Sequence, residues 1–122
     1  MNISTFAKLT GLSIHTLRYY EKLGLLSNIG RNASGHRCYT PADAQWVNFI
    51  NRLKATGMPL QQIIDYARLR ALGTPTLAAR NRLLCQHRDA LQQRLQQDLE
   101  HLHALEAKIA LYQQQLNKVA DQ

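Results

Sequence analysis

The last third of the chain contains no residue that breaks a helix, and this limits its possible folds more than any other feature. After Pro75 the sequence has neither Gly nor Pro, and it is rich in Leu, Gln, Ala and Arg, which favour helices. Residues 77 to about 118 are therefore predicted to form one helix of roughly 60 Å, at ~1.5 Å per residue. No breaker lets this helix fold back into a hairpin, so its apolar side needs another surface to cover it.

Apolar residues recur along this helix at alternating spacings of three and four, which is the pattern of a coiled coil. Arg88 and Asp98 interrupt the pattern at two of its positions. Because a lone helix cannot bury such a stripe, we expect it to pair with a second copy of the chain in a homodimer. The predicted dimerisation residues, the apolar stripe, are Leu84, Leu91, Leu95, Leu102, Leu105, Ile109, Tyr112 and Leu116.

The excess positive charge is confined to the rest of the chain. Residues 1–80 carry ten Lys and Arg and three Asp and Glu, whereas residues 81–122 carry five of each. This distribution suits a polyanionic partner. The two cysteines are too few for a disulfide framework and favour a reducing compartment, and no apolar run approaches the ~18 residues of a membrane span. We expect a cytoplasmic protein with no membrane partner.

Two short helices separated by a glycine are predicted near the N-terminus. Asn2 is a suitable N-cap for the first helix, Gly11 supplies the turn, and Ser13 is a suitable N-cap for the second. The apolar spacing of the second helix turns its other face outward, and the pair is a helix-turn-helix. The outward residues of the second helix are His15, Thr16, Arg18, Tyr19 and Lys22.

A basic hairpin is predicted after the second helix. The segment 32–35 has the composition of a tight turn between two short strands. Side chains alternate between the two faces of a strand, so Arg37 and Tyr39 are expected on one face of the returning strand, and His36 and Cys38 on the other. Such a hairpin beside a helix-turn-helix is a wing.

The remaining helix signals complete the predicted fold. Thr40-Pro41 is typical of the start of a third helix, and Pro59 of a fourth. We therefore predict an all-α protein with a small β-hairpin wing. Its parts are a winged helix-turn-helix DNA-binding domain at residues 1–71, a linker at 72–76, and a long coiled-coil dimerisation helix at 77–122.

Residues on the second helix and the hairpin are of the types that hold double-stranded DNA. Arg18 can reach a phosphate or a guanine edge, and Tyr19 can hydrogen-bond a phosphate. Arg31 and Arg37 suit phosphate clamps, and Tyr39, in phase with Arg37, is a second phosphate donor. The predicted DNA-binding residues are Ser13, His15, Thr16, Arg18, Tyr19, Lys22, Arg31, His36, Arg37 and Tyr39. Paired carboxylates, a nucleophile with its base and a phosphate loop are missing, so neither an enzyme nor a cofactor is expected.

These segments together resemble the MerR-type family of helix-turn-helix transcription regulators. The matching runs are Thr16-Leu17-Arg18-Tyr19-Tyr20-Glu21, Gly24-Leu25-Leu26, Arg31-x-x-x-Gly35-His36-Arg37-x-Tyr39 and Gly57-Met58-Pro59-Leu60. The resemblance implies a homodimer joined by antiparallel long helices, which binds a palindromic promoter site. It also implies that the bound dimer distorts a promoter spacer that is too long for RNA polymerase, and so controls transcription.

Within that family the chain is most similar to the small subgroup that responds to reactive aldehydes and related stress and lacks a large effector domain. That subgroup has a sensor cysteine in the third helix, where this chain has Arg52. Cys85 and Cys38 are the remaining candidate thiol sensors for an electrophile or oxidative stress. Potential metal ligands on the long helix lie about 200° apart around its axis, so no metal site is expected. The alternative function is an effector-independent architectural protein that bends DNA.

Overall fold

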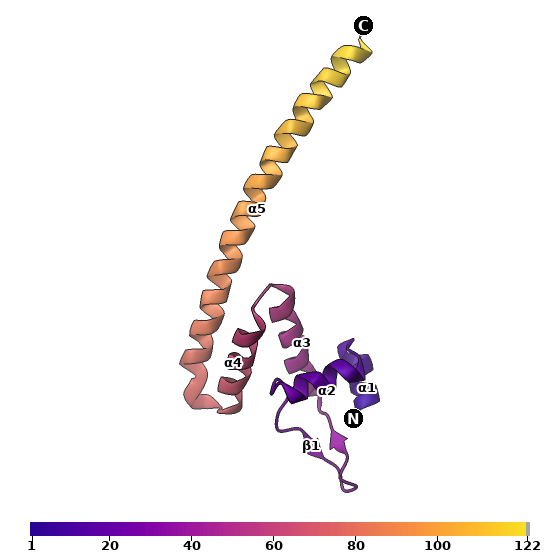
Figure 1. Ribbon diagram of the computed structural model, residues 1–122, viewed down its shortest axis with the longest axis vertical. Helices are drawn as coiled ribbons and strands as arrows, with labels where there is room; N and C mark the ends of the chain where they lie inside the picture. Colours follow the sequence, from indigo (N-terminus) through magenta and orange to yellow (C-terminus); the bar gives the residue numbers. More distant parts are fainter. Residues whose placement is uncertain (122) are drawn as a thin grey trace. The chain divides into compact units, whose positions relative to one another are not determined.

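The structure, a computed structural model, describes residues 1–121 and is helical apart from one two-stranded hairpin (Figure 1). The predicted fold class is confirmed. Residue 122, the last of the predicted dimerisation helix, lies outside the described residues. The elements are α1 (Ile3–Thr10), α2 (Ile14–Lys22), β1 (Gly30–Arg31), β2 (Arg37–Cys38), α3 (Pro41–Ala55), α4 (Leu60–Ala71), the 3₁₀ helix η1 (Thr74–Thr76) and α5 (Leu77–Ala120).

The helix-turn-helix begins and ends where the capping residues predict. Oδ1 of Asn2 accepts a hydrogen bond from the backbone N–H of Thr5 at 2.9 Å, and Oγ of Ser13 accepts one from Thr16 at 3.0 Å. Each bond satisfies an N–H group that has no partner within its own helix. α1 stops at Gly11, whose φ of +73° is a left-handed conformation that glycine adopts without a steric penalty.

The hairpin is short, and its two strands pair antiparallel. Gly30 lies opposite Cys38, and Arg31 lies opposite Arg37. Oδ1 of Asn32 accepts hydrogen bonds from two backbone N–H groups of the turn, at 3.0 and 3.1 Å. This side chain therefore holds the tip of the wing in one conformation.

The side chain of Tyr39 corrects one expectation. Alternation along the strand predicts an exposed Tyr39 beside Arg37, but Tyr39 is only 2% exposed and its ring stacks on Phe6 with centroids 4.3 Å apart. Strand pairing ends at Cys38, and the backbone of Tyr39 instead exchanges hydrogen bonds of 2.8 and 2.6 Å with Met1. The chain thus turns into the core at this point, just before α3 begins.

Side chains of α1, α2, α3 and α4 pack together in one hydrophobic core. α3 starts with a capping box, in which Thr40 and Asp43 each accept a hydrogen bond from the other's backbone N–H. Inside the core, Nε1 of Trp46 donates to the carbonyl of Leu25 at 2.7 Å, so the buried indole leaves no polar group unpaired. The largest fully buried side chains are Tyr20, Phe6, Leu17, Leu25, Ile50, Ile63 and Val47.

The chain divides into two compact units, Met1–Cys85 and a second that starts at Gln86. The first unit extends into α5 because Leu83 and Leu84 pack against its core. The predicted linker is held by hydrogen bonds: Oγ1 of Thr76 donates to the carbonyl of Leu69 at 2.6 Å. The functional division into residues 1–71, 72–76 and 77–122 stays a prediction.

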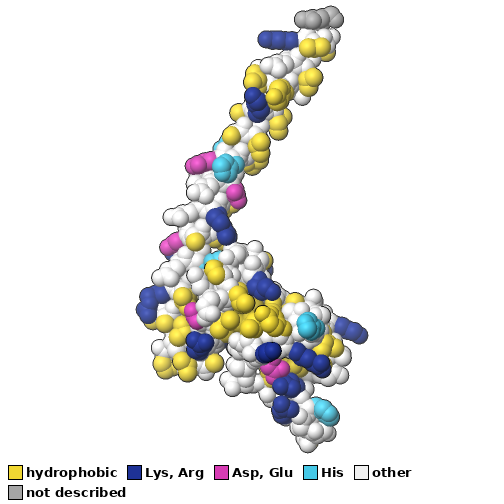
Figure 2. Space-filling model, in the orientation of Figure 1, with side chains coloured by type: hydrophobic (Ala, Val, Ile, Leu, Met, Phe, Trp, Pro, Cys, Tyr) yellow, Lys and Arg dark blue, Asp and Glu magenta, His cyan; other side chains and the backbone are white. Residues whose placement is uncertain are grey.

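The second unit is a helix whose apolar side is open to solvent. Members of the apolar stripe from Leu95 to Leu116 are all exposed, Ile109 most of all at 64%. Figure 2 shows hydrophobic side chains on the surface along the length of the long helix. Leu84 differs from the exposed members of the stripe because it belongs to the first unit and packs against its core.

Candidate nucleic-acid interface

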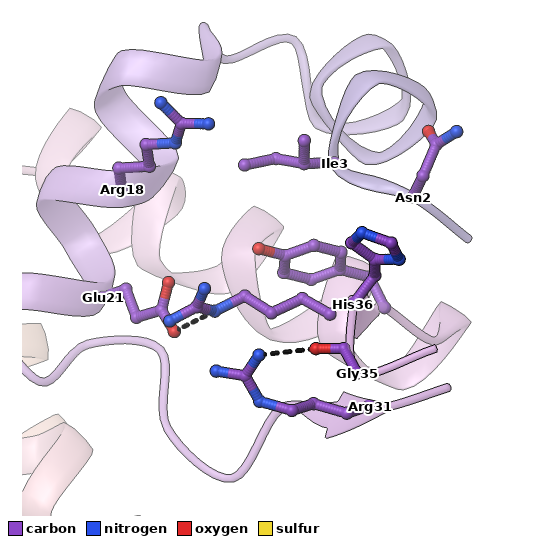
Figure 3. A pocket seen from close by; sticks show the side chains of 9 residues that line it. Asn2, Ile3, Arg18, Glu21, Arg31, Gly35 and His36 are labelled. Carbon is purple, nitrogen blue, oxygen red and sulfur yellow. Dashed lines mark hydrogen bonds and ion pairs between the residues drawn. The ribbon is translucent and has the colours of Figure 1, made fainter. Parts of the chain in front are cut away.

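A depression of 320 Å³ lies among α1, α2 and the hairpin, and Figure 3 shows it from close by. We call it the basic depression. It brings together five of the predicted DNA-binding residues, although they are spread over more than twenty positions of the sequence. The lining residues are Asn2, Ile3, Arg18, Glu21, Arg31, Gly35, His36, Arg37 and Tyr39.

The three arginines of the basic depression differ in their partners. Nε of Arg37 donates to Oε1 of Glu21 at 2.5 Å, which joins the hairpin to α2. Nη1 of Arg31 donates to the carbonyl of Gly35 at 2.7 Å, across the base of the turn. Arg18 is exposed, and among residues 1–121 it makes no hydrogen bond or ion pair. All three keep guanidinium N–H groups that can bind an anion.

The hydroxyl of Tyr39 is the polar part of this otherwise buried side chain. Burial, and secondarily the charge of Glu21, raise its pKa above the usual value, while Arg37 and Arg18 oppose the shift. The hydroxyl therefore stays protonated at neutral pH and can donate a hydrogen bond to an anionic oxygen. Tyr39 lines the basic depression. Because its ring is buried, only the hydroxyl could serve as the predicted phosphate donor.

The other predicted residues lie along α2. His15, Tyr19 and Lys22 are exposed, and Tyr19 shows 48% of its surface. Ser13 and Thr16 stand at the start of the helix, where Oγ of Ser13 donates to Oγ1 of Thr16 at 2.9 Å. The predicted set thus occupies two adjoining places, the outer face of α2 and the basic depression.

Four lining residues were not among the predicted DNA-binding residues: Asn2, Ile3, Glu21 and Gly35. Glu21 could have been found, because it follows Arg18 by three residues and such pairs share one face of a helix. Asn2 and Ile3 line the basic depression because α1 packs near the hairpin, and no local sequence pattern indicates how these two elements pack.

The two candidate thiols form no disulfide. Cys38 and Cys85 are both free and half-buried, and Sγ of Cys38 lies 3.6 Å from the amino nitrogen of Met1. Within residues 1–121, no group of three or more His, Cys, Asp and Glu side chains is placed to hold a metal ion. Nor does any helix of that range have the length and apolar character to cross a membrane.

The fold and this surface define a winged helix-turn-helix protein of the DNA-binding class. Two family models match the chain: the MerR HTH family regulatory protein over residues 1–69, and the MerR DNA-binding region over residues 44–100. The chain belongs to the MerR family and is a DNA-binding transcription regulator. The predicted family is confirmed.

Its relatives are regulators as well. The chain is 36% identical to an HTH-type transcriptional regulator of Haemophilus influenzae, over 88% of this chain and 79% of that one. It is 38% identical to the HTH-type transcriptional regulator AdhR of Bacillus subtilis, over 75% of this chain and 65% of that one. Among solved structures, the chain is similar to HiNmlR, a MerR family regulator lacking the sensor domain, bound to promoter DNA. The TM-score is 0.79 at 34% sequence identity, and the alignment covers 93% of this chain and 90% of HiNmlR.

The placement of Arg37 gives a testable expectation. Replacing Arg37 by Ala should weaken binding to DNA and reduce the slope of log K against log salt by about one, because one phosphate contact is lost. Fluorescence anisotropy over a salt series measures both effects. Lys118→Ala, which removes one charge from the last turn of α5, is the control. An unchanged slope in the Arg37 variant would exclude Arg37 from the phosphate contacts.

Proposed function

We propose that the protein is a homodimer that binds a palindromic promoter site and distorts an over-long spacer, so that RNA polymerase can use the promoter. The observation that carries this proposal is the basic depression, where α2 and the wing present three arginines to one anionic surface. A helix can enter the major groove while the wing grips the adjacent backbone. The relative bound to promoter DNA supports the same use of this surface.

The exposed apolar stripe supports the homodimer. Leucine and isoleucine side chains in succession on one side of α5 would lose contact with water if two such helices paired. A second copy of the chain is the natural partner, because the stripe extends from Leu95 to Leu116 with a single break at Asp98 and would face the same stripe on that copy. Two DNA-binding units would then be carried by one two-fold assembly.

A two-fold assembly explains why distortion follows from binding. Each unit reads one half-site, and the paired helices set the distance between the two units. If that distance differs from the spacing of the half-sites on straight DNA, part of the binding free energy deforms the spacer. The protein would then affect transcription by changing the shape of the promoter DNA, rather than through a contact with RNA polymerase.

Leu102 tests the dimer and the site together. Leu102→Asp puts a charge in the middle of the apolar stripe, so we expect monomers in sedimentation and loss of the operator footprint, since one unit holds only half a site. Gln96→Asp adds the same charge to an exposed residue outside the stripe and should leave both unchanged. Hydroxyl-radical footprinting of the wild type should show two half-sites in one promoter spacer. Coverage without a fixed phase would instead identify an architectural DNA-bending protein.

For the signal, we propose a response of Cys38 or Cys85 to an electrophile or oxidant. Cys38 ends β2 beside Arg37 and Tyr39, so a group added to its sulfur would displace the residues that line the basic depression. Cys85 stands early in α5, where a modification would act on the helix that joins the two DNA-binding units. Both thiols are partly exposed and can be reached.

Transcription in vitro separates the two thiols. We expect an aldehyde or a mild oxidant to alter transcription from the target promoter with wild-type protein. The response should vanish in either Cys38→Ser or Cys85→Ser, and in the double variant. A response that survives the double substitution would dismiss thiol sensing while leaving promoter binding intact.

A further inference from the structure

We propose that Glu21 makes this surface selective for its operator over other DNA. The carboxylate of Glu21 would repel the DNA backbone in non-specific complexes, where the backbone is not held in one position. The same carboxylate would hold the guanidinium of Arg37 in the orientation that the operator complex uses. The inference rests on the proposed DNA-binding function and assigns a specificity-determining role to a residue that carries the wrong charge for phosphate binding.

Glu21 is the one acidic residue among those that line the basic depression within the described chain. Its side chain is 27% exposed, so the carboxylate is partly open to whatever enters. Figure 3 shows it on α2 with its ion pair directed toward the hairpin. An anion that reaches the arginines therefore also approaches a fixed negative charge.

The charge of Glu21 acts across the basic depression. At the Tyr39 hydroxyl its effect on the pKa is larger than that of either Arg37 or Arg18, and opposite in sign. Opposite charges in one site do not merely cancel, because a phosphate that binds must stand close to the arginines and clear of the carboxylate. Few placements of the DNA backbone satisfy both conditions.

The ion pair also fixes Arg37. Only Nε is bound to Glu21, which leaves both terminal nitrogens of the guanidinium to form a forked contact with a phosphate. The side chain of Arg37 is 43% exposed, and without a partner it would have to be ordered when DNA binds. Glu21 orders it beforehand, and this helps the complex in which the phosphate sits at that fork.

Selectivity follows from the difference between the two kinds of complex. In a non-specific complex the backbone is held in many positions, so repulsion by Glu21 is not compensated. In the operator complex one phosphate meets the oriented Arg37, and the gain offsets the repulsion. A penalty placed against the wrong partner is a general route to specificity.

Glu21→Gln tests the inference, because glutamine keeps the size and an acceptor oxygen but removes the charge. We expect the dissociation constant for DNA of unrelated sequence to fall roughly 3- to 10-fold, the range for one partly exposed charge. Affinity for the operator should change by less than about 2-fold, so the specificity ratio falls. Glu100→Gln, the same charge change at an exposed residue of α5, should leave the ratio unchanged.

The Arg37→Ala background gives a second reading. There Glu21→Gln should raise affinity for operator and unrelated DNA by the same factor, because no guanidinium remains to be oriented. The inference is overturned if Glu21→Gln shifts both affinities equally in the wild-type background, or if Glu100→Gln lowers the ratio as much. A wild type that binds DNA without preferring any operator would contradict the proposed function and, with it, this inference. Thermal melting of each variant confirms that it is folded.

Discussion

The burial of Tyr39 holds together the candidate DNA-binding surface. Its ring stacks on Phe6, and its backbone pairs with Met1, so the returning strand of the wing is fixed to α1 before α3 begins. A stacked pair of this kind contributes about 0.5–1.5 kcal/mol beyond the burial of its area. Because the wing is anchored there, Arg37 on that strand stays within reach of α2, where Glu21 meets it. A two-residue strand alone could not hold these charges in register.

Much of this architecture could be predicted from local sequence. The caps at Asn2 and Ser13, the capping box at Thr40 and the absence of breakers after Pro75 each act over a few residues, and the helices begin and end accordingly. Three of the residues that line the basic depression, Arg18, Arg31 and Arg37, could likewise be predicted as DNA-binding residues from their charge and their local sequence. These features need no knowledge of tertiary packing.

What the sequence did not reveal depends on contacts between distant segments. Strand alternation predicts an exposed Tyr39, but the backbone of Tyr39 pairs with Met1, the first residue of the chain, and its side chain enters the core. The partnership of Glu21 with Arg37 joins a helix to a strand sixteen positions away, and a search for basic residues passes over an acid. Leu84 fits the spacing of the apolar stripe and yet packs on the core of its own unit.

We propose that two copies of the DNA-binding unit are related by a two-fold axis, and that the promoter spacer is distorted because its half-site spacing differs from the distance between the two units. A series of promoters with spacers of different length tests whether the protein distorts the spacer. Transcription by RNA polymerase would be measured in vitro, with and without the protein, from the target promoter and from versions shortened by one and two base pairs. We expect transcription to need the protein at the natural spacer length, and we expect the protein to become neutral or inhibitory as the spacer shortens. Activation that is equal at every length would contradict this expectation, because untwisting the spacer would then play no part.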